Sequence, residues 1–457
     1  MPIDTSQPQS PGWWFLKLMG ELAARQSRYS RLDRYYRGNP DLPFAGEAAR
    51  AAYQRVQAKC RTNFAGLIVE AVRERVMPVG FRTGAEGDEL GDAEAWRIWQ
   101  ANGLDAQYPQ LMRASLSMSD AYVIVGGVDK GTGAPLITAE DPRQVITAHD
   151  PRNRRNVVAA LKVFTDDMAG ADLAYLYLPG KVYRATRKAA PVYAEQVTAE
   201  GWDWYDEANV PGGVVPVVRF PNRADLAGNT LGEFEDVIDI LDRINLTLLQ
   251  RVTIAAMQAF RQRAIKGDMP ETDGEGNEID YDDLFRADPG ALWQLPSGVD
   301  LWESGTVDLG PLLSSIRHDV QDVAAVTRTP LFYLTPDAAN GSAEGASLAR
   351  EGLVFKTEDR LVERSDPTEQ VMSLAFLFAG DTVRAKRADM EVLWAPAERF
   401  TLAERYDAAA KAIAAQVPWE TVMAEVLQFS PQTIARMQAQ RTGDALNTLL
   451  ATPDAVA

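Results

Sequence analysis

The sequence predicts an α+β protein in which helices come first, a strand-rich region follows, and long helices occupy the second half. The length allows this, because 457 residues suffice for two or three domains of about 100–200 residues each. The composition is that of a globular chain, with 46% hydrophobic and 24% charged residues. Hydrophobic residues recur at helical spacing in some stretches and in short apolar runs in others. A collagen-like, low-complexity or wholly disordered chain is therefore excluded.

The first 230 residues divide into a helical part and a strand-rich part. The first helix is rich in aromatic residues and arginines, and the run Gly38-Asn39-Pro40 ends it. From Ala121 onward, apolar residues form short runs that are typical of strands in a mixed or antiparallel sheet. The expected helices are 12–37, 46–76 and 92–104, and the expected strands are 121–125, 157–164, 172–178 and 214–220.

Residues 232–266 predict one unusually long helix. No proline or glycine follows Gly232 in this stretch, and Gly267 suits its C-terminal end. Acidic residues fill the first turns and basic residues the last, which complements the helix dipole. At ~1.5 Å per residue the helix is about 50 Å long, and its modest apolar stripe needs packing partners. The stripe includes Ile244, Leu248, Val252, Ala255 and Ala256.

A short insert and a returning helix follow the long helix. Residues 268–289 hold nine acidic residues and one arginine, as expected of a solvated loop. They do not match a calcium loop, because Glu278 stands where glycine is needed and Leu284 stands where glutamate is needed. The sequence therefore predicts a stalk of two helices with a small tip. The expected elements are strands at 291–296 and 299–303 and a helix from Pro311 to Thr329.

The remainder of the chain is mainly helical. A long helical pattern over 342–379 is expected to kink at Asp366-Pro367. One strand is expected over 389–395. Capping signals at Thr401…Glu404 and at Ser430-Pro431 predict two further helices.

The net charge is −17, and it is unevenly distributed. Residues 1–200 carry about +2 and residues 201–457 about −19. Affinity for DNA comes mainly from lysines and arginines that neutralise phosphates, so the chain is not expected to hold nucleic acid tightly. A chain of this kind can still surround DNA without gripping it.

The residues needed for most enzyme chemistry are scarce. Cys60 is the single cysteine, which excludes a disulfide framework and a thiolate-rich zinc site and fits a reducing cytosol. The two histidines exclude a three-histidine metal site; His149 is expected in a loop, and His318 in a surface ion pair between Arg317 and Asp319. No phosphate-binding loop, dinucleotide fingerprint, GxSxG or HExxH occurs. We expect no catalytic residue, no metal and no cofactor.

No run of about 18 apolar residues occurs, so no membrane span is expected. The start, Met1-Pro2-Ile3-Asp4-Thr5, lacks the basic and then apolar pattern of a signal peptide. The expected product is soluble and intracellular.

Four short motifs stand in a fixed order. They are Tyr35-Tyr36-x-Gly38, Asn63…Ile68-Val69-Glu70-Ala71-Val72, Gly80-Phe81 and Ser342…Gly345-Ala346-Ser347-Leu348-Ala349-Arg350. The strand-rich region, the long helix, the short insert and the returning helix all lie between the third motif and the fourth. In this order the chain resembles the portal proteins of tailed double-stranded-DNA bacteriophages, of the kind found in long-tailed phages of actinobacteria. The resemblance covers nearly the whole chain and is weakest beyond about residue 400.

The resemblance implies an α+β portal fold with a wing of helices and strands, a long-helix stem, a small α/β clip and a helical crown. The implied parts are the wing at 1–230 and 342–395, stem helices at 231–266 and 310–330, the clip at 267–309, the tunnel-loop segment at 331–341 and the crown at 396–457. The apolar stripe of the long helix would pack the stem, and Trp293 and Trp302 would be clip residues. The tunnel loop, which otherwise is a plain surface turn, would consist of Thr335, Pro336, Asp337, Ala338, Ala339, Asn340 and Gly341.

The implied assembly is a ring, usually of twelve copies, at one capsid vertex of the virion, built in the host cytoplasm. It would be the channel for DNA packaging and ejection, without catalysis or a cofactor of its own. The implied partners are further copies of the chain, double-stranded DNA contacted without sequence preference, the terminase large subunit, the head–tail adaptor and the major capsid or scaffolding protein. No membrane is implied.

Two other classes of function remain open. Residues 405–441 have the pattern of a helix-turn-helix DNA-binding protein, but the helix 431–441 offers only Arg436 and Arg441 as cations for reading bases. A nuclease or protease fused to a capsid component lacks the expected motifs and would depend on His149 or His318.

Overall fold

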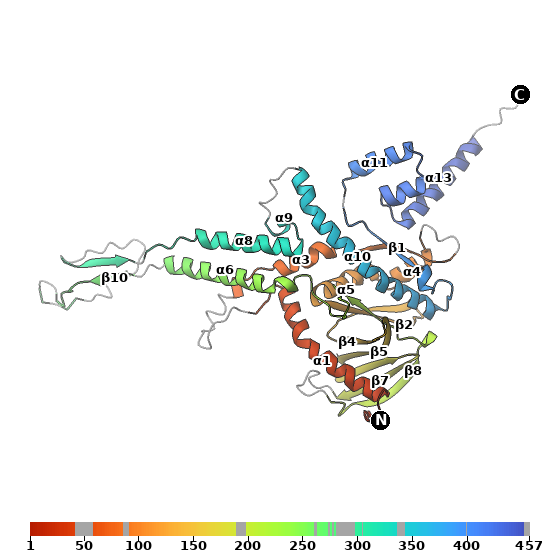
Figure 1. Cartoon of the computed structure of the whole chain (residues 1–457), viewed down its shortest axis with the longest axis horizontal. Coiled ribbons are helices and arrows are strands. Elements are labelled where there is room, and N and C mark those ends of the chain that lie inside the picture. The colour runs from red at the N-terminus through yellow and green to blue at the C-terminus, as the bar shows by residue number, and fades with distance from the viewer. Residues whose placement is uncertain are drawn as a thin grey trace. The chain divides into compact units, whose positions relative to one another are not determined.

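The chain divides into two compact units. Figure 1 labels the helices and strands that belong to them. The first unit comprises residues 1–41, 63–241 and 322–457, and the second comprises residues 42–62 and 242–321. The structure is a computed structural model that describes residues 1–41, 58–85, 91–188, 198–259, 263–272, 275–276, 278–279, 298–303, 305–335, 343–398 and 400–451.

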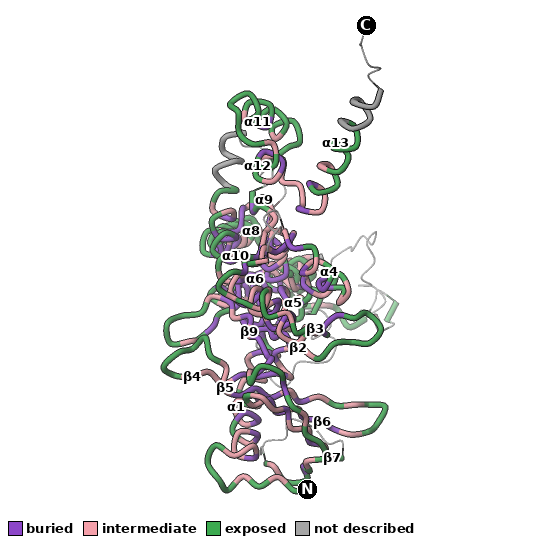
Figure 2. Tube along the Cα trace, turned by 90° about the vertical axis from the view of Figure 1, so that its right-hand side faces the viewer, coloured by how far each residue is buried: buried purple, intermediate pink, exposed green. Residues whose placement is uncertain are grey.

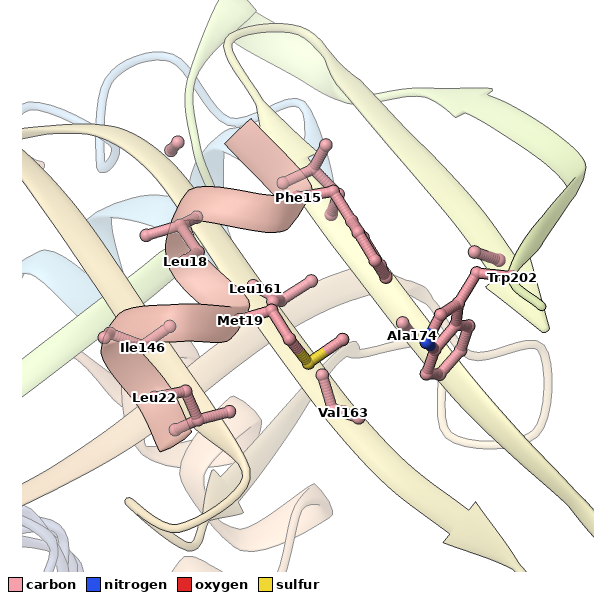
Figure 3. Packing of buried hydrophobic residues seen from close by; sticks show 12 residues of the cluster. Phe15, Leu18, Met19, Leu22, Ile146, Leu161, Val163, Ala174 and Trp202 are labelled. Atoms are coloured by element: carbon pink, nitrogen blue, oxygen red, sulfur yellow. The ribbon is translucent and has the colours of Figure 1, made fainter. Parts of the chain in front are cut away.

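The first unit opens with helix α1 (Pro11–Tyr36), which confirms the predicted helix 12–37. The hydroxyl of Ser10 accepts a hydrogen bond from the backbone N–H of Trp13 (3.2 Å), so the helix has a side-chain cap at its start. One face of α1 is apolar and buried against a five-stranded sheet. Figure 3 shows this packing, with Phe15, Leu18 and Leu22 on the helix facing Ile146, Leu161, Val163 and Ala174 on the strands.

The five-stranded sheet is antiparallel, with the order β4-β5-β6-β7-β8. Val163, Ala174 and Ala185 lie in register on neighbouring strands and contribute to the core beneath α1. Tyr177 and Val182 pair across the strands and belong to a second buried cluster. The predicted strands 157–164 and 172–178 are confirmed as parts of β5 and β6. The strands are β4 (Val145–Asp150), β5 (Asn153–Asp166), β6 (Ala171–Leu178), β7 (Lys181–Lys188) and β8 (Asp203–Asn209).

A three-stranded sheet with the order β3-β2-β9 lies in the same unit. Strand β2 (Asp120–Val128) confirms the predicted strand 121–125 and pairs with β3 (Pro135–Glu140) and β9 (Val217–Pro221). The prediction of a strand from residue 214 is wrong by three residues. Pro216 has no N–H to donate, and the ladder begins at the next residue, after the turn η1 (Pro211–Gly213).

Three helices connect α1 to the sheets. The single helix predicted over 46–76 is wrong near Asn63, because the Asn63 side chain accepts a hydrogen bond from Gly66 N–H (2.9 Å) and starts a new helix. Residues 46–57 of that prediction lie outside the described residues. The helix predicted at 92–104 is found with a shorter span, and a further helix follows it. These helices are α3 (Phe64–Arg73), α4 (Ala93–Ala101) and α5 (Leu104–Met118).

The C-terminal part of the first unit contains the longest helix, α10 (Ala343–Ala379), which runs through Pro367 as one helix of 37 residues. After the turn η4 (Arg387–Asp389), β12 (Glu391–Trp394) confirms the predicted strand and pairs with β1 (Pro78–Arg82). Helix α11 (Leu402–Ala414) begins with the predicted capping box of Thr401 and Glu404 and is almost entirely exposed, as Figure 2 shows. The remaining elements are α12 (Trp419–Thr421), the π-helix η5 (Val422–Val426) and α13 (Pro431–Ala451).

The second unit is built on two long helices and a strand pair. The turn η2 (Glu235–Val237) leads into α6 (Ile238–Ala259), and α8 (Gly310–Thr327) confirms the predicted returning helix. Strand β10 (Arg263–Lys266) pairs with β11 (Asp300–Glu303), which confirms the strand predicted at 299–303. The strand predicted at 291–296 lies outside the described residues.

The long helix therefore ends earlier than predicted. Residues 263–266 were expected to be its last turn, but they form cross-strand pairs such as Ile265 with Leu301. Backbone hydrogen bonds to a partner strand replace the helical ones, and helical spacing within one segment does not reveal a partner so far along the chain. Among the described residues, no helix has both the length and the apolar character needed to cross a bilayer.

Candidate functional site

Helices α6 and α8 form an antiparallel pair in the second unit. Near the start of α6, the guanidinium of Arg243 lies 2.6 Å from the carboxylate of Asp319. Near the end of α6, the side-chain amide of Gln258 donates to the carbonyl of Val307, just before α8 (2.8 Å). These two contacts hold opposite ends of the pair, and the predicted out-and-back geometry is therefore found. Asp319 takes its cation from the facing helix rather than from the ion pair expected around His318.

The predicted stem residues follow a gradient of burial along α6. Ile244 is buried and Leu248 is half-buried, but Val252 is 38% exposed and both Ala255 and Ala256 are exposed. The apolar stripe of the helix thus continues past the point where this chain itself covers it. Leu246 on α6 and Leu313 on α8 are also large apolar side chains left exposed.

The strand pair β10–β11 also presents apolar side chains to solvent. Trp302 is 55% exposed on β11, beside the exposed Leu301, and Val307 is exposed in the segment that leads to α8. Trp293, the other predicted clip residue, lies outside the described residues.

The predicted tunnel loop begins where the short helix α9 (Leu331–Leu334) ends. The backbone N–H and the hydroxyl of Thr335 both donate to the carbonyl of Leu331, at 2.8 and 3.1 Å. Just before it, the Tyr333 hydroxyl accepts a hydrogen bond from Arg75 (2.9 Å) and donates one to Glu74 (3.0 Å), at the end of α3. The residues Pro336, Asp337, Ala338, Ala339, Asn340 and Gly341 lie outside the described residues.

Residues 232–235, which we call the anchor segment, attach the start of α6 within the first unit. Gly232 passes so close to the carbonyl oxygen of Ser117 that a Cβ atom at this position would lie 2.7 Å from it. The side chain of Phe234 is buried, and its ring stacks on Tyr35 at a centroid distance of 6.5 Å. Glu235 receives two hydrogen bonds from the guanidinium of Arg28 on α1, at 2.7 and 2.8 Å.

Glu233 in the anchor segment is a buried carboxylate with two cations from α10. Its oxygens lie 2.7 Å from Nζ of Lys356 and 2.6 Å from Nε of Arg360. Burial alone would raise the pKa of Glu233, but these two cations outweigh burial and lower the pKa to about 2. The carboxylate is therefore ionised at neutral pH and binds α10 to the start of α6.

This cluster was not predicted from the sequence, although one signal for it was present. Lys356, Arg360 and Arg364 stand four residues apart and share one face of α10. All three are buried, and Arg364 donates to the side chain of Asn222 (2.7 Å). A stripe of cations on one helix face predicts a carboxylate partner when that face is buried.

The two histidines lie on separate elements, His149 on β4 and His318 on α8. His149 lies on β4 rather than in a loop, and its ring nitrogens contact the carbonyl of Arg154 (2.7 Å) and the hydroxyl of Thr147 (3.0 Å). Burial lowers the pKa of His149, which favours the neutral ring. Among the described residues no three His, Cys, Asp or Glu side chains are placed to hold a metal ion.

The sequence matches the family described as phage portal protein, SPP1 Gp6-like, over residues 17–445. The chain belongs to this portal protein family. The portal protein of Mycobacterium phage L5 is 30% identical over 382 residues, which cover 78% of this chain and 73% of that protein. The portal protein of Mycobacterium phage D29 is 29% identical over 361 residues, which cover 76% of this chain and 71% of that protein.

Portal family membership confirms the resemblance drawn from the sequence motifs and element order. The matched range includes residues 405–441, so the helix-turn-helix alternative is not favoured. Among solved structures, a chain from the neck of an empty GTA particle, computed with C6 symmetry, aligns with a TM-score of 0.45 at 12% identity. That alignment covers 84% of this chain and 94% of the solved one.

Proposed function

We propose that the chain forms a ring at one vertex of a phage capsid, and that double-stranded DNA passes through the ring during packaging and ejection. The observation that carries the proposal is the apolar stripe of α6, whose residues Val252, Ala255 and Ala256 are exposed in the single chain of a portal family member. Apolar residues on a long helix need a partner surface. In a ring, the neighbouring copy supplies that surface, and identical contacts repeat until the circle closes.

The charge of the chain supports a channel with weak contact to DNA. Residues 201–457, which include α6, α8 and the segment between them, carry about −19, whereas residues 1–200 carry about +2. DNA has to slide past the wall for its whole length, and wall cations that displace its counterions would slow it. A neutral or acidic wall repels the duplex only weakly, because salt screens charges beyond about 8 Å. We therefore infer sequence-independent contact without base readout.

The parts of the ring follow from the position of each segment in the chain. Helices α6 and α8 are the stem, and the segment 267–309 between them is the clip, with Trp302 exposed for a partner. The clip meets the terminase large subunit during packaging and the head–tail adaptor afterwards. The strand-rich region and α10 form the wing, and residues 396–457 form the crown on the capsid side, where the major capsid or scaffolding protein is the expected neighbour.

Residues 335–341 are proposed as the tunnel loop that narrows the channel. The support is positional: the segment lies between α9 and α10, directly after the returning stem helix. Just before the segment, the hydroxyl of Tyr333 forms hydrogen bonds with Arg75 and Glu74. No catalytic role is proposed for any residue, and the ring acts as a conduit.

The decisive experiment measures the mass of the purified full-length chain and images it end-on. Twelve copies of a 50.2 kDa chain give a particle of about 600 kDa with a central hole. A regulator of transcription would instead be a monomer or dimer that retards one particular DNA fragment at moderate salt. A compact monomer at high concentration would refute the ring.

A further inference from the structure

The chain leaves α8 at Thr327, passes through α9 and residues 335–341, and returns along α10. We call this stretch between α8 and α10 the excursion, and one side chain connects the two helices that flank it. Nζ of Lys356, on α10, donates to the carbonyl oxygen of Thr327 at 2.9 Å and lies 2.7 Å from the carboxylate of Glu233. Three segments that are far apart in the sequence therefore meet at one ammonium group.

All three groups at this junction are buried. Lys356 is 5% exposed, and Glu233 and Thr327 are buried as well. A buried ammonium is costly unless it is paired and hydrogen-bonded, so Lys356 keeps its charge here only while both partners stay in place. Thr327 is the last residue of α8, and its carbonyl, at the negative end of the helix dipole, is a favourable site for a cation.

The carboxylate of Glu233 is held from several sides, which makes it a fixed reference point. Arg360 donates to it at 2.6 Å and the side-chain amide of Asn222 at 3.1 Å, while the backbone N–H of Glu233 donates to the carbonyl of Leu116 (2.8 Å). Asn222 and Leu116 lie outside α8, α9 and α10, so the position of Lys356 is set in part by groups on other elements.

We propose that Lys356, held by Glu233, is the positioning residue of the loop 335–341. It ties α10 to the end of α8, and so fixes the helices on either side of this segment to each other and to Glu233. Tyr333 supports the same attachment through Arg75 and Glu74. This inference rests on the proposed function of the loop in the channel, and it adds the residues on which the placement of the loop depends.

Hydrogen exchange on the full-length chain tests the proposal. Lys356→Met removes both contacts, and amides in peptides covering 320–335 and 350–360 should exchange about tenfold faster, while peptides of β4–β7 stay unchanged. Lys356→Arg keeps a cation at this place and should restore slow exchange. The matched control is Lys411→Met, because Lys411 forms an exposed ion pair with Asp407 on α11; it should leave exchange at 320–335 unchanged.

A second set of variants tests the role of the carboxylate. Glu233→Gln leaves Lys356 and Arg360 without their anion and should lower the melting temperature more than Lys356→Met does. Adding Lys356→Met to Glu233→Gln removes one of the two unpaired cations, so the double variant should melt no lower than Glu233→Gln alone. If Lys356→Met yields no folded protein, the variant Glu233→Asp tests the proposal instead, because it keeps the carboxylate charge on a shorter side chain. Fast hydrogen exchange at 320–335 in this variant supports the proposal. Slow exchange there overturns it.

The functional readout is the amount of DNA packaged into particles that carry the Lys356→Met chain. Rings of normal mass with reduced DNA content are expected, and Lys356→Arg should restore packaging. The proposal fails if Lys356→Met and Lys411→Met give the same exchange and the same DNA content. If the unmodified chain forms no ring, the proposed function is wrong, while the exchange measurements still decide whether Lys356 ties α10 to the end of α8.

Discussion

Arg243 on α6 and Asp319 on α8 form an ion pair across the hairpin, with 2.6 Å between Nη2 and Oδ1. The Asp319 side chain is only 9% exposed, whereas that of Arg243 is 54% exposed. The guanidinium therefore lies at the surface and covers a carboxylate that is turned into the helix pair. The two partners contribute unequally, since losing the cation leaves a buried charge and losing the anion leaves a solvated one.

Arg243→Met should destabilise the hairpin by about 1–3 kcal/mol, because the Asp319 carboxylate then stays buried without a partner. Asp319→Asn should have a smaller effect, since Arg243 can turn into water. The double variant Arg243→Leu with Asp319→Leu should recover most of the loss. Urea unfolding of the full-length chain measures all three, and equal stability of Arg243→Met and the unmodified chain would contradict the prediction.

The buried Glu233 predicts a stability that depends on pH. Burial opposes ionisation, but Lys356 and Arg360 outweigh it and lower the pKa from 4.5 to about 2. A carboxyl group with a lowered pKa in the folded state stabilises the fold fully above about pH 4.5, and this contribution is lost as the pH falls towards 2. The full contribution is about 3 kcal/mol. The free energy of unfolding should be measured at pH 3, 4 and 7 for the unmodified chain and for Glu233→Gln. The difference between the two should become smaller as the pH falls, and a constant difference would contradict the prediction.

Ala255→Asp should prevent ring formation without unfolding the single chain. Ala255 is exposed on α6 in the single chain, so the new carboxylate stays solvated there, but in a ring it would face a neighbouring helix. We expect association at least about tenfold weaker, measured as the loss of the large particle by light scattering. Ala106→Asp, at an exposed position of α5 outside the stem, is the matched control and should keep its rings. Unchanged particle mass in Ala255→Asp would remove Ala255 from the stem interface.

Deletion of residues 336–340 should leave the ring intact and impair DNA packaging or retention. The deletion lies after α9, whose contacts through Tyr333 and Thr335 remain. Replacing the same five residues by glycine and serine keeps the length and separates the effect of length from that of sequence. Particle mass and packaged DNA length are the two measurements, and normal packaging by the deletion variant would rule out a tunnel loop at this position.

Trp302 should report on assembly through its fluorescence. Its side chain is 55% exposed on β11, and burial against a neighbouring copy or partner should shift its emission to shorter wavelength. The difference between the spectra of the unmodified chain and Trp302→Phe isolates this residue from the other tryptophans. A difference spectrum that is the same before and after assembly would place Trp302 away from any interface.

Local rules were enough to predict the elements whose order forms the fold. The helix 12–37 could be predicted because its apolar residues and the terminating run Gly38-Asn39-Pro40 are close together in the sequence, and α11 was marked by Thr401 and Glu404. The error at 263–266 arose because a distant partner decides the structure there, whereas the errors near Asn63, Pro216 and His149 had local causes. Residues 263–266 continue a helical pattern but pair with 300–303, and His149 joins a strand whose partner follows it.

The candidate site was predictable only in outline. The apolar stripe of α6 could be read from spacing, and the exposure of Ala255 and Ala256 required the structure. The junction of Glu233, Lys356 and Thr327 joins segments separated by up to 123 positions. The spacing of the cations on α10 indicates a shared face, but it does not reveal which carboxylate they meet. Charge at a buried position is the physical signal that local periodicity does not contain.

The close passage of Gly232 beside Ser117 has a consequence for directed evolution of this chain. Hydrogen is the only side chain that fits there, since any Cβ would meet a carbonyl oxygen at 2.7 Å. A library randomised at this codon should return glycine almost alone, whereas neighbouring surface codons should tolerate wide diversity. Attempts to graft a different helix pair onto the first unit should therefore keep this glycine and join the new sequence beyond Glu235.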